Sequence, residues 1–229
     1  MKKFLYIIAL GLIFVLMQGC AVSNPITKAQ AYDKMYSEKP IAILVMPPIN
    51  RSTNVEAKGY FHSTLCVPLA NAGYYVIPPF LSMEMLKKES AYDAELFLDA
   101  PVNKFGEYFG ADVALFTIIH RWDKSALAAK VYVDIEYILK STKTNEVIFS
   151  RIGHITYDAS VSSGSGGLLG ALVDMAASAI STALTQYVSV ARSCNSYTLS
   201  DLPAGKYSPN HELDGTNNAG LKDFKVTLR

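Results

Sequence analysis

Three cysteine thiols are the side chains of this sequence with the most distinctive chemistry. Cys20 directly follows a charged and then apolar N-terminal stretch, a position where a thiol can carry a lipid. Cys66 and Cys194 lie far along the chain, and in an oxidising compartment two such thiols can form a disulfide. The alternative is that each is a small buried apolar residue. Both alternatives stay open, because pairing depends on a distance that a sequence does not show.

The residues around Cys20 predict the attachment of a lipid. Lys2 and Lys3 precede an apolar run over 4–17, which is shorter than the ~20 residues that span a bilayer. The run ends in LMQGC, which resembles a bacterial lipobox, where signal peptidase II cuts before the cysteine. Met17 and the glutamine after it depart from the commonest pattern, and the alternative is an ordinary secretory signal with a chance cysteine. We expect Cys20 to carry a diacylglycerol and an N-acyl chain, and we expect no other cofactor.

The residue after Cys20 and the charge balance indicate where the protein works. Ala21 stands where an aspartate would favour the inner membrane, so we expect an outer-membrane protein that faces the periplasm. Loss of Lys2 and Lys3 with the signal changes the formal net charge from +1 to −1. A nearly neutral chain lacks the basic footprint of a nucleic-acid-binding protein and a polybasic patch for anionic lipid. The covalent lipid is then the predicted membrane anchor.

The other titratable side chains do not form a pattern typical of catalysis. The four histidines are scattered, with no His/Cys/Glu spacing that matches a metal site. Nucleophile-elbow, zinc-protease and dinucleotide-binding motifs are missing from the sequence. The glycine-rich stretch 164–170 could hold an anion, but it lacks the Lys-Ser/Thr of a P-loop, which favours a linker. We therefore predict neither an enzyme nor a metal site.

Two segments are candidates for contact with other proteins. Arg121 and Trp122 end a strongly apolar run, and both residue types are enriched at binding hot spots. The alternative for Trp122 is packing at a sheet edge. Gly166 and Gly167 lead into a helix rich in small residues over 168–191, which could pack on its own sheet or form a surface for self-association.

The pattern of apolar residues predicts an α/β domain. Apolar runs at 41–46, 74–77 and 113–119 are typical of buried strands, whereas 130–139 alternates like a half-exposed strand. The segment 147–157 returns as the second arm of a hairpin, with a predicted bulge near Gly153 that changes its phase. Helices are expected between these segments. The order favours one mixed sheet of about five strands with helices packed on it.

The composition divides the chain into four parts. We predict a signal peptide over 1–19 and a lipid-anchored tether over 20–39. An α/β domain over 40–194 would follow, and then an extended C-terminal tail over 195–229, which is polar and rich in Pro, Gly and Asn.

Four short segments resemble known bacterial proteins. Residues 41–52 and 110–116 are similar to segments of the TolB N-terminal-like fold, which curli-secretion lipoproteins share. Together with the lipobox, the glycine-rich stretch 164–170 and the Leu-Pro-Ala-Gly at 202–205, they resemble a bacterial lipoprotein family of unknown function typified by a neisserial surface antigen. The resemblance implies a TolB-like core and a role in envelope assembly or export. It also implies a curli-channel-like lipoprotein and a second small lipoprotein as partners.

These observations favour a lipid-anchored periplasmic module that binds other envelope proteins. One alternative is an oligomeric transport or secretion component that uses the glycine-rich stretch and the last helix. Another is a cell-wall hydrolase whose nucleophile and base are assembled only in space. Which envelope protein is bound, and whether the chain also forms a homo-oligomer, stays open at this stage.

Overall fold

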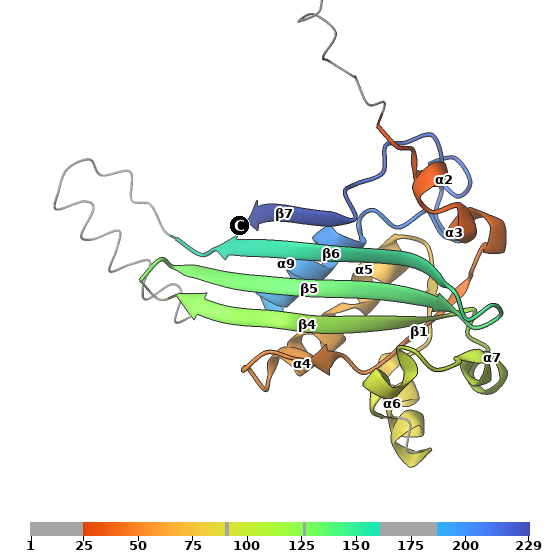
Figure 1. Ribbon diagram of the computed structural model, residues 1–229, viewed down its shortest axis with the longest axis horizontal. Coiled ribbons are helices and arrows are strands. Elements are labelled where there is room, and N and C mark those ends of the chain that lie inside the picture. Colours follow the sequence, from red (N-terminus) through yellow and green to blue (C-terminus); the bar gives the residue numbers. More distant parts are fainter. Residues whose placement is uncertain (1–24, 90–91, 126, 161–186) are drawn as a thin grey trace, which may run out of the picture.

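The residues that the structure describes build one mixed sheet of seven strands with helices packed against it (Figure 1). The computed structural model describes residues 25–89, 92–125, 127–160 and 187–229. Six strands follow the order β3-β1-β4-β5-β6-β7, and β2 pairs with β4 beside β1. The strands are β1 (Ala42–Val45), β2 (Ile49–Asn50), β3 (Tyr75–Val76), β4 (Val113–Ser125), β5 (Lys130–Ser141), β6 (Val147–Asp158) and β7 (Asp223–Leu228).

The helices divide between the two faces of this sheet. One set packs on the face that carries the main core, defined by the buried cluster that includes Phe61, Trp122, Tyr137 and Cys194. That set consists of α3 (Asp33–Glu38), α4 (Ala57–Thr64), α5 (Cys66–Asn71) and α9 (Tyr187–Leu199), with α2 (Lys28–Ala31) preceding α3. The other face carries a small core around Leu44 and Phe116, covered by α6 (Pro79–Lys88), η1 (Ala94–Phe97) and α7 (Asn103–Phe109). None of these described helices has the length and apolar character that crossing a bilayer requires.

The buried strands lie where the apolar runs predict them. In β1, Ile43 and Val45 enter the main core, and Leu44 enters the small core. The first half of β4 behaves in the same way, with Leu115 on one side and Phe116 on the other. Side chains of a strand alternate between faces, so a strand covered on both sides must be apolar at every position. The predicted α/β class with a mixed sheet is therefore confirmed.

The prediction of about five strands is too low. Strand β2 was missed because it is only two residues long and follows two prolines, yet it pairs in parallel with β4. Strand β7 lies in the segment 195–229 that the composition assigns to an extended tail, and it pairs in parallel with β6. In addition, α9 continues to Leu199, so the domain does not end at residue 194. The burial of Phe224 in the main core explains why this polar segment joins the sheet.

The hairpin of β5 and β6 is present, but its irregularities lie elsewhere than predicted. The register shifts fall between Ile119 and Arg121 in β4 and between Leu139 and Lys140 in β5. Gly153 instead lies in regular pairing with Ile135. A Cβ at Gly153 would stand 2.6 Å from Cζ of Phe224, so glycine is needed there for the close approach of β7.

The described part of the predicted tether is folded rather than extended. Thr27 begins α2 with a capping box, in which its hydroxyl accepts from the backbone N–H of Gln30 and the Gln30 side chain accepts from the N–H of Thr27. Tyr32 and Met35 are both buried in the main core. Tyr32 lies between α2 and α3 and Met35 lies within α3, and the burial of these two side chains explains why the segment packs on the domain.

The two ends of the described chain hold each other in what we call the clasp, residues 25–38 with 200–222. The N–H of Lys28 donates to the carbonyl of Asn217 at 2.8 Å, and the N–H of Ala219 donates to the carbonyl of Ile26 at 2.8 Å. Below them, the Tyr32 hydroxyl donates to the buried carboxylate of Asp201. Burial, together with Asp201, raises the pKa of Tyr32, so the phenol keeps the proton that it donates.

Candidate functional site

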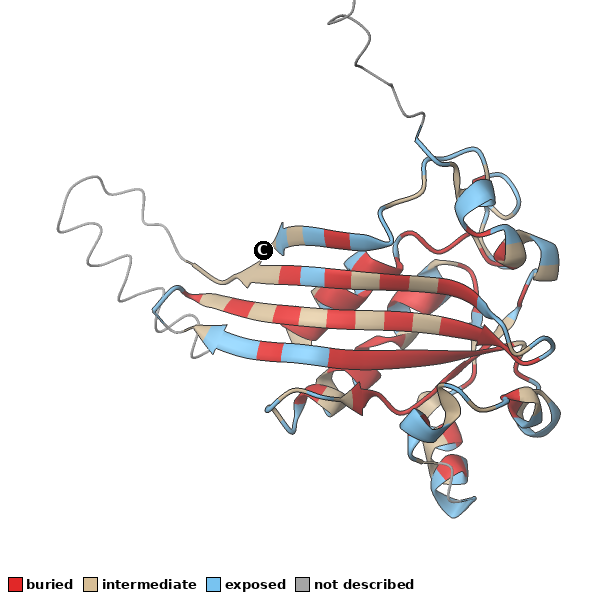
Figure 2. Ribbon diagram, viewed as in Figure 1, coloured by how far each residue is buried: buried red, intermediate tan, exposed pale blue. Residues whose placement is uncertain are grey.

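The strands β4 to β7 carry polar side chains on the face opposite the main core, and we call this surface the open face. Along β5, Val131, Val133 and Ile135 enter the main core, while the residues between them point the other way and are half-buried. Figure 2 shows this alternation along β5 and the exposed end of β4. The open face consists of His120, Arg121, Asp123, Tyr132, Asp134, Glu136, His154, Asp223 and Lys225.

The bulge in β4 decides which residues reach the open face. Ile119 and Trp122 both lie in the main core although they are three residues apart, because the register shifts between Ile119 and Arg121. His120 and Arg121 are consequently both exposed. Trp122 is only 2% exposed and packs against Phe61, with ring centroids 5.4 Å apart in a T-shaped arrangement. The prediction of Trp122 as an interaction residue is therefore wrong, and its packing alternative holds, whereas Arg121 is available at the surface.

A row of polar side chains, a histidine among charged residues, crosses the open face through neighbouring strands. The pairing register places Arg121, Asp134, His154 and Lys225 side by side from β4 to β7. His154 Nδ1 lies 2.8 Å from Asp134 Oδ1, and Arg121 Nη1 lies 3.8 Å from Asp134 Oδ2. His154 Nε2 also lies 3.4 Å from Oδ1 of Asp223. The row thus combines both signs of charge within one continuous surface.

A second pair and a stacked ring widen this row. His120 Nε2 lies 3.0 Å from Oε2 of Glu136, and the Arg121 guanidinium stands over the Tyr132 ring, 4.9 Å from its centroid. A shallow depression of about 320 Å³ lies between these groups, lined by Arg121, Tyr132, Asp134, His154, Ile155, Thr156 and Lys225. Its polar groups are partly solvated, and ion pairs of that kind contribute only ~0–1 kcal/mol to stability. They can therefore exchange their present partners for those of another molecule at little cost to the fold.

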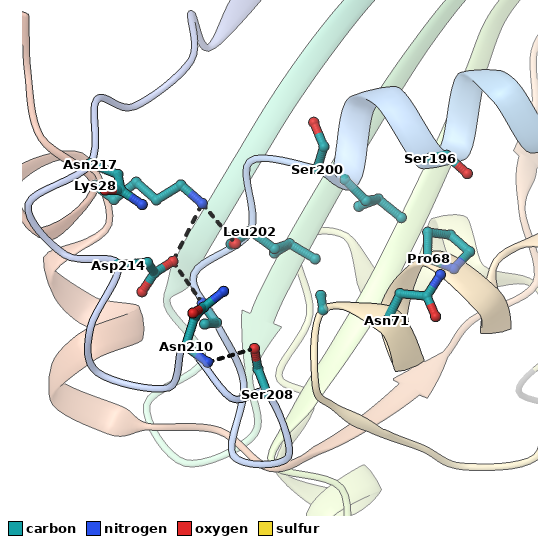
Figure 3. A pocket seen from close by; sticks show the side chains of 13 residues that line it. Lys28, Pro68, Asn71, Ser196, Ser200, Leu202, Ser208, Asn210, Asp214 and Asn217 are labelled. Carbon is teal, nitrogen blue, oxygen red and sulfur yellow. Dashed lines mark hydrogen bonds and ion pairs between the residues drawn. The ribbon is translucent and has the colours of Figure 1, made fainter.

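A polar cavity of about 340 Å³ between α5, α9 and the clasp is the other candidate (Figure 3). Hydroxyl and amide groups of Asn71, Ser196 and Ser200 line it. Its two charged residues neutralise each other, because Lys28 Nζ lies 3.4 Å from Oδ2 of Asp214 and also donates to the carbonyl of Leu202 at 3.1 Å. The cavity is suited to hydrogen bonding, but it presents no unpaired charge for an ionic ligand.

The two internal cysteines are free thiols in the structure, so the candidate Cys66–Cys194 disulfide is not formed. Cys194 points into the main core, whereas Cys66 is half-buried and lies outside that cluster. Burial raises the pKa of Cys194 to about 12, and burial also raises the pKa of Cys66. Both thiols are therefore poor nucleophiles, because the thiolate is the reactive form.

Several predicted site residues lie outside the described part of the chain. Cys20, Gly166 and Gly167 belong to this group, together with most of the predicted last helix. In the residues that the structure does describe, no group of three or more His, Cys, Asp or Glu is arranged to hold a metal ion.

The partners of Arg121 are not evident from the sequence. The alternation over 130–139 does place Asp134 and Glu136 on the outer face of the strand. The pairing of Asp134 with His154 depends on the hairpin register, which the irregular pattern of 147–157 did not reveal. The contribution of Asp223 and Lys225 was missed because β7 itself was missed.

Comparison with known sequences gives one family. A family model described as "Putative lipoprotein GNA1162-like" matches residues 30–206. A curated protein of Neisseria meningitidis serogroup B (strain ATCC BAA-335 / MC58), "Putative lipoprotein NMB1124/NMB1162", is 29% identical over 185 residues, which cover 77% of this chain and 81% of that protein.

Comparison with solved structures gives further similarities. A crystal structure of lipoprotein GNA1162 from Neisseria meningitidis has a TM-score of 0.47 and 26% identity, and it covers 62% of this chain and 98% of that one. A PelC dodecamer from Paraburkholderia phytofirmans has a TM-score of 0.41 and 15% identity, with 71% of this chain and 88% of that chain covered. The LpoB C-terminal domain from Escherichia coli has a TM-score of 0.38 and 18% identity, with coverage of 55% and 95%.

Proposed function

This chain belongs to the GNA1162-like lipoprotein family, and from that premise we propose that it is a lipid-anchored envelope protein that binds another envelope protein through its open face. The anchor is the acylated Cys20, and the site of action is the periplasmic side of the outer membrane. Membership of a lipoprotein family supports the lipid anchor.

The observation that carries this proposal is the row of mixed charges on an otherwise uncovered part of the sheet. None of the described helices packs over Arg121, Asp134 or His154, whereas α4 and α9 pack on the other side of the same strands. Charges at an interface are arranged to complement those of the partner, and they fix its register more than its affinity. The matching partner is a protein surface that alternates acidic and basic groups at the spacing of the strands.

The partners that the family resemblance implies are a curli-channel-like lipoprotein and a second small lipoprotein. Both would be held at the same membrane, so a weak contact would suffice, since tethering raises the effective concentration. The polarity of the open face favours such a reversible contact over an obligate one, because obligate interfaces are more apolar.

Site-specific photo-crosslinking in living cells tests this proposal. A benzophenone amino acid would replace Tyr132 on the open face and, as an aromatic-for-aromatic control, the 70% exposed Tyr108 of α7. We expect a discrete adduct with an envelope protein only from position 132, identified by mass spectrometry, and its loss in an Arg121→Glu variant. Equal adducts from both positions, or an Arg121→Glu variant that crosslinks normally, would contradict the open face as the binding surface.

The anchor is tested separately by cell fractionation. The Cys20→Ala variant lacks the acceptor thiol and should move from the membrane to the soluble periplasmic fraction, while a Cys66→Ala variant should stay at the membrane. A Cys20→Ala protein that remains membrane-bound would contradict lipid anchoring.

The mass of the crosslinked adduct at position 132 also shows whether the bound protein is a second copy of this chain. That result would contradict the proposed partner and indicate self-association through the open face.

A further inference from the structure

An apolar groove lies beside the point where the described chain begins. It has a volume of about 680 Å³ and is formed by three segments that are distant in sequence: 25–34, the start of β6 and the residues just before β7. Ile26 is 62% exposed at one wall, and Leu221 is 74% exposed at another. Val147 adds a third exposed apolar side chain. Large apolar side chains gathered at one surface groove are typical of an interaction site.

Hydrogen bonds of the clasp fix the backbone that carries these exposed side chains. The backbone bond from Ala219 N–H to the carbonyl of Ile26 ties the two walls together. Next to it, the N–H of Gly220 donates to Asp201 Oδ1 at 2.9 Å, and Asp201 is also the acceptor of Tyr32. A Cβ at Gly220 would stand 2.5 Å from the Arg151 guanidinium, so the backbone at Gly220 packs closely against Arg151. Ile26 and Leu221 are therefore presented by a well-braced backbone.

The groove lies very close to the predicted lipid anchor. Pro25 lines it, and Cys20 is five residues earlier in the sequence. A fully extended chain spans at most ~3.3–3.6 Å per residue, so the groove lies within about 18 Å of the anchored thiol. The folding of residues 27–38 into the clasp removes the long tether that the composition predicts.

The basic residues of the groove suit a phospholipid surface. Two lysines, Lys34 and Lys222, line the groove together with one acidic residue, Asp33, and Lys222 is exposed beside Leu221. Lys34 Nζ lies 3.0 Å from Oε2 of Glu146, a pair in which both side chains are about half exposed. Basic residues next to apolar ones favour the boundary between headgroups and acyl chains, where the cation meets phosphate and the apolar group enters the bilayer.

We infer that this groove is a second membrane contact, in which Ile26 and Leu221 enter the bilayer interface and fix the orientation of the domain. The inference rests on the proposed anchoring through Cys20, because two apolar side chains alone would bind weakly, and the tether supplies the high effective concentration. The contact would leave the open face projecting from the membrane. His154 lies four residues beyond Ser150 of the groove along β6, about 13 Å at 3.3 Å per residue.

Depth-dependent fluorescence quenching tests the inference on the full-length lipidated protein. The protein is reconstituted into vesicles of phosphatidylethanolamine and phosphatidylglycerol, with a tryptophan reporter at Leu221→Trp or, as a matched control, at Leu81→Trp. Leu81 is 57% exposed in α6, which lies below the strands in the view of Figure 1, whereas α2 lies above them. The buried Trp122 contributes the same background to both variants.

We expect lipids brominated near the headgroup to quench Leu221→Trp at least about threefold more strongly than Leu81→Trp, because only the first reporter reaches the interface. Adding Ile26→Glu should reduce that quenching toward the control. Equal quenching of the two reporters would overturn the inference. A second result would also overturn it: brominated lipid does not quench the Leu221→Trp emission, and acrylamide quenching of that emission weakens only at high protein concentration. In that case a second copy of the chain would occupy the groove.

Vesicle flotation separates the failure of this inference from the failure of the anchor. If the full-length protein floats with the vesicles while Leu221→Trp is not quenched, the anchor stands and the groove contact is wrong. If the protein does not float, lipid anchoring itself is wrong. The Cys20→Ala protein provides the reference, since it should neither float nor show quenching at position 221.

Discussion

The two faces of the hairpin formed by β5 and β6 use polar groups in opposite ways. On the covered face, the Tyr137 hydroxyl donates to the side chain of Asn195, and the Asn195 amide donates to the Thr64 hydroxyl at 2.8 Å and to the carbonyl of Phe61 at 3.0 Å. All of these groups are buried. On the open face, Asp134 and His154 form an equally short pair, but 47% of the His154 side chain is exposed.

This difference indicates where stability and recognition reside. Removing the partner of a buried hydrogen-bonding group lowers the free energy of unfolding by ~1–3 kcal/mol, whereas removing one member of an exposed ion pair lowers it by only ~0–1 kcal/mol. The covered face therefore holds β5 against α4 and α9, and the open face can change partners without unfolding the domain. The proposed binding site occupies the side of the sheet on which the fold depends least.

Cysteine reactivity should show the largest contrast between covered and accessible positions. Under native conditions at pH 8, iodoacetamide should modify Cys66 at least about 100-fold faster than Cys194, because Cys194 becomes accessible only when the core opens. Intact-mass measurements over time, with a fully denatured sample as the control, give both rates. Similar rates would contradict the burial of Cys194. A mass lower by two hydrogens with no labelling would show that the disulfide forms after all.

Neighbouring residues of β5 provide the next contrast. Ile135→Ala removes a fully buried side chain from the main core and should lower the free energy of unfolding by about 2–5 kcal/mol. Glu136→Ala, one residue further on the open face, should change it by about 1 kcal/mol or less, although it removes the partner of His120. Urea denaturation of both variants measures the two values. A Glu136→Ala cost as large as that of Ile135→Ala would mean that the open face is part of the core.

Substitutions of polar residues should have the smallest effects on stability, and here too the covered face should be affected more than the open face. Asn195→Ala leaves the Tyr137 hydroxyl without its acceptor and removes one donor each from the Thr64 hydroxyl and the Phe61 carbonyl, so it should cost about 1–3 kcal/mol. The matched open-face change, Asp134→Asn, should cost less than about 1 kcal/mol, and its effect should shrink further as salt is added. Thermal unfolding at low and high salt compares them. The two-face comparison fails if the exposed substitution is the more destabilising one.

Much of the fold could be predicted because each buried strand leaves a local pattern. The runs containing Ile43 and Leu115 are almost continuously apolar because both of their faces are covered, with Thr117 the buried exception in the second run. The alternation from Val131 to Leu139 reflects one covered face. The four-residue spacing of Phe61, Leu65 and Leu69 likewise marks the inner side of α4 and α5. The family was also correctly predicted, from the order of short motifs along the chain.

The parts that escaped prediction depend on contacts between distant segments. Strand β7 lies in a polar stretch, and it joins the main core through Phe224, with Val226 and Leu228 packed against the core beside it. The polar residues 25–38 were assigned to a tether because nothing local shows that Tyr32 meets Asp201 or that Lys28 meets Asn217. Only part of the candidate site could be predicted, for the same reason. Arg121 stands out in the sequence, but its neighbours come from three other strands.

The sequence by itself determined the family, the α/β class, the two-faced character of β5 and the expectation of a lipid on Cys20, because these depend on residue type and spacing along a short stretch. Only the tertiary structure decided which side chains meet. A bulge after Ile119 turned Trp122 inward and left Arg121 outside, and the pairing register then placed Asp134 and His154 beside it. A shift of one residue moves a strand's side chains to the other face, and such shifts are set by packing across the sheet.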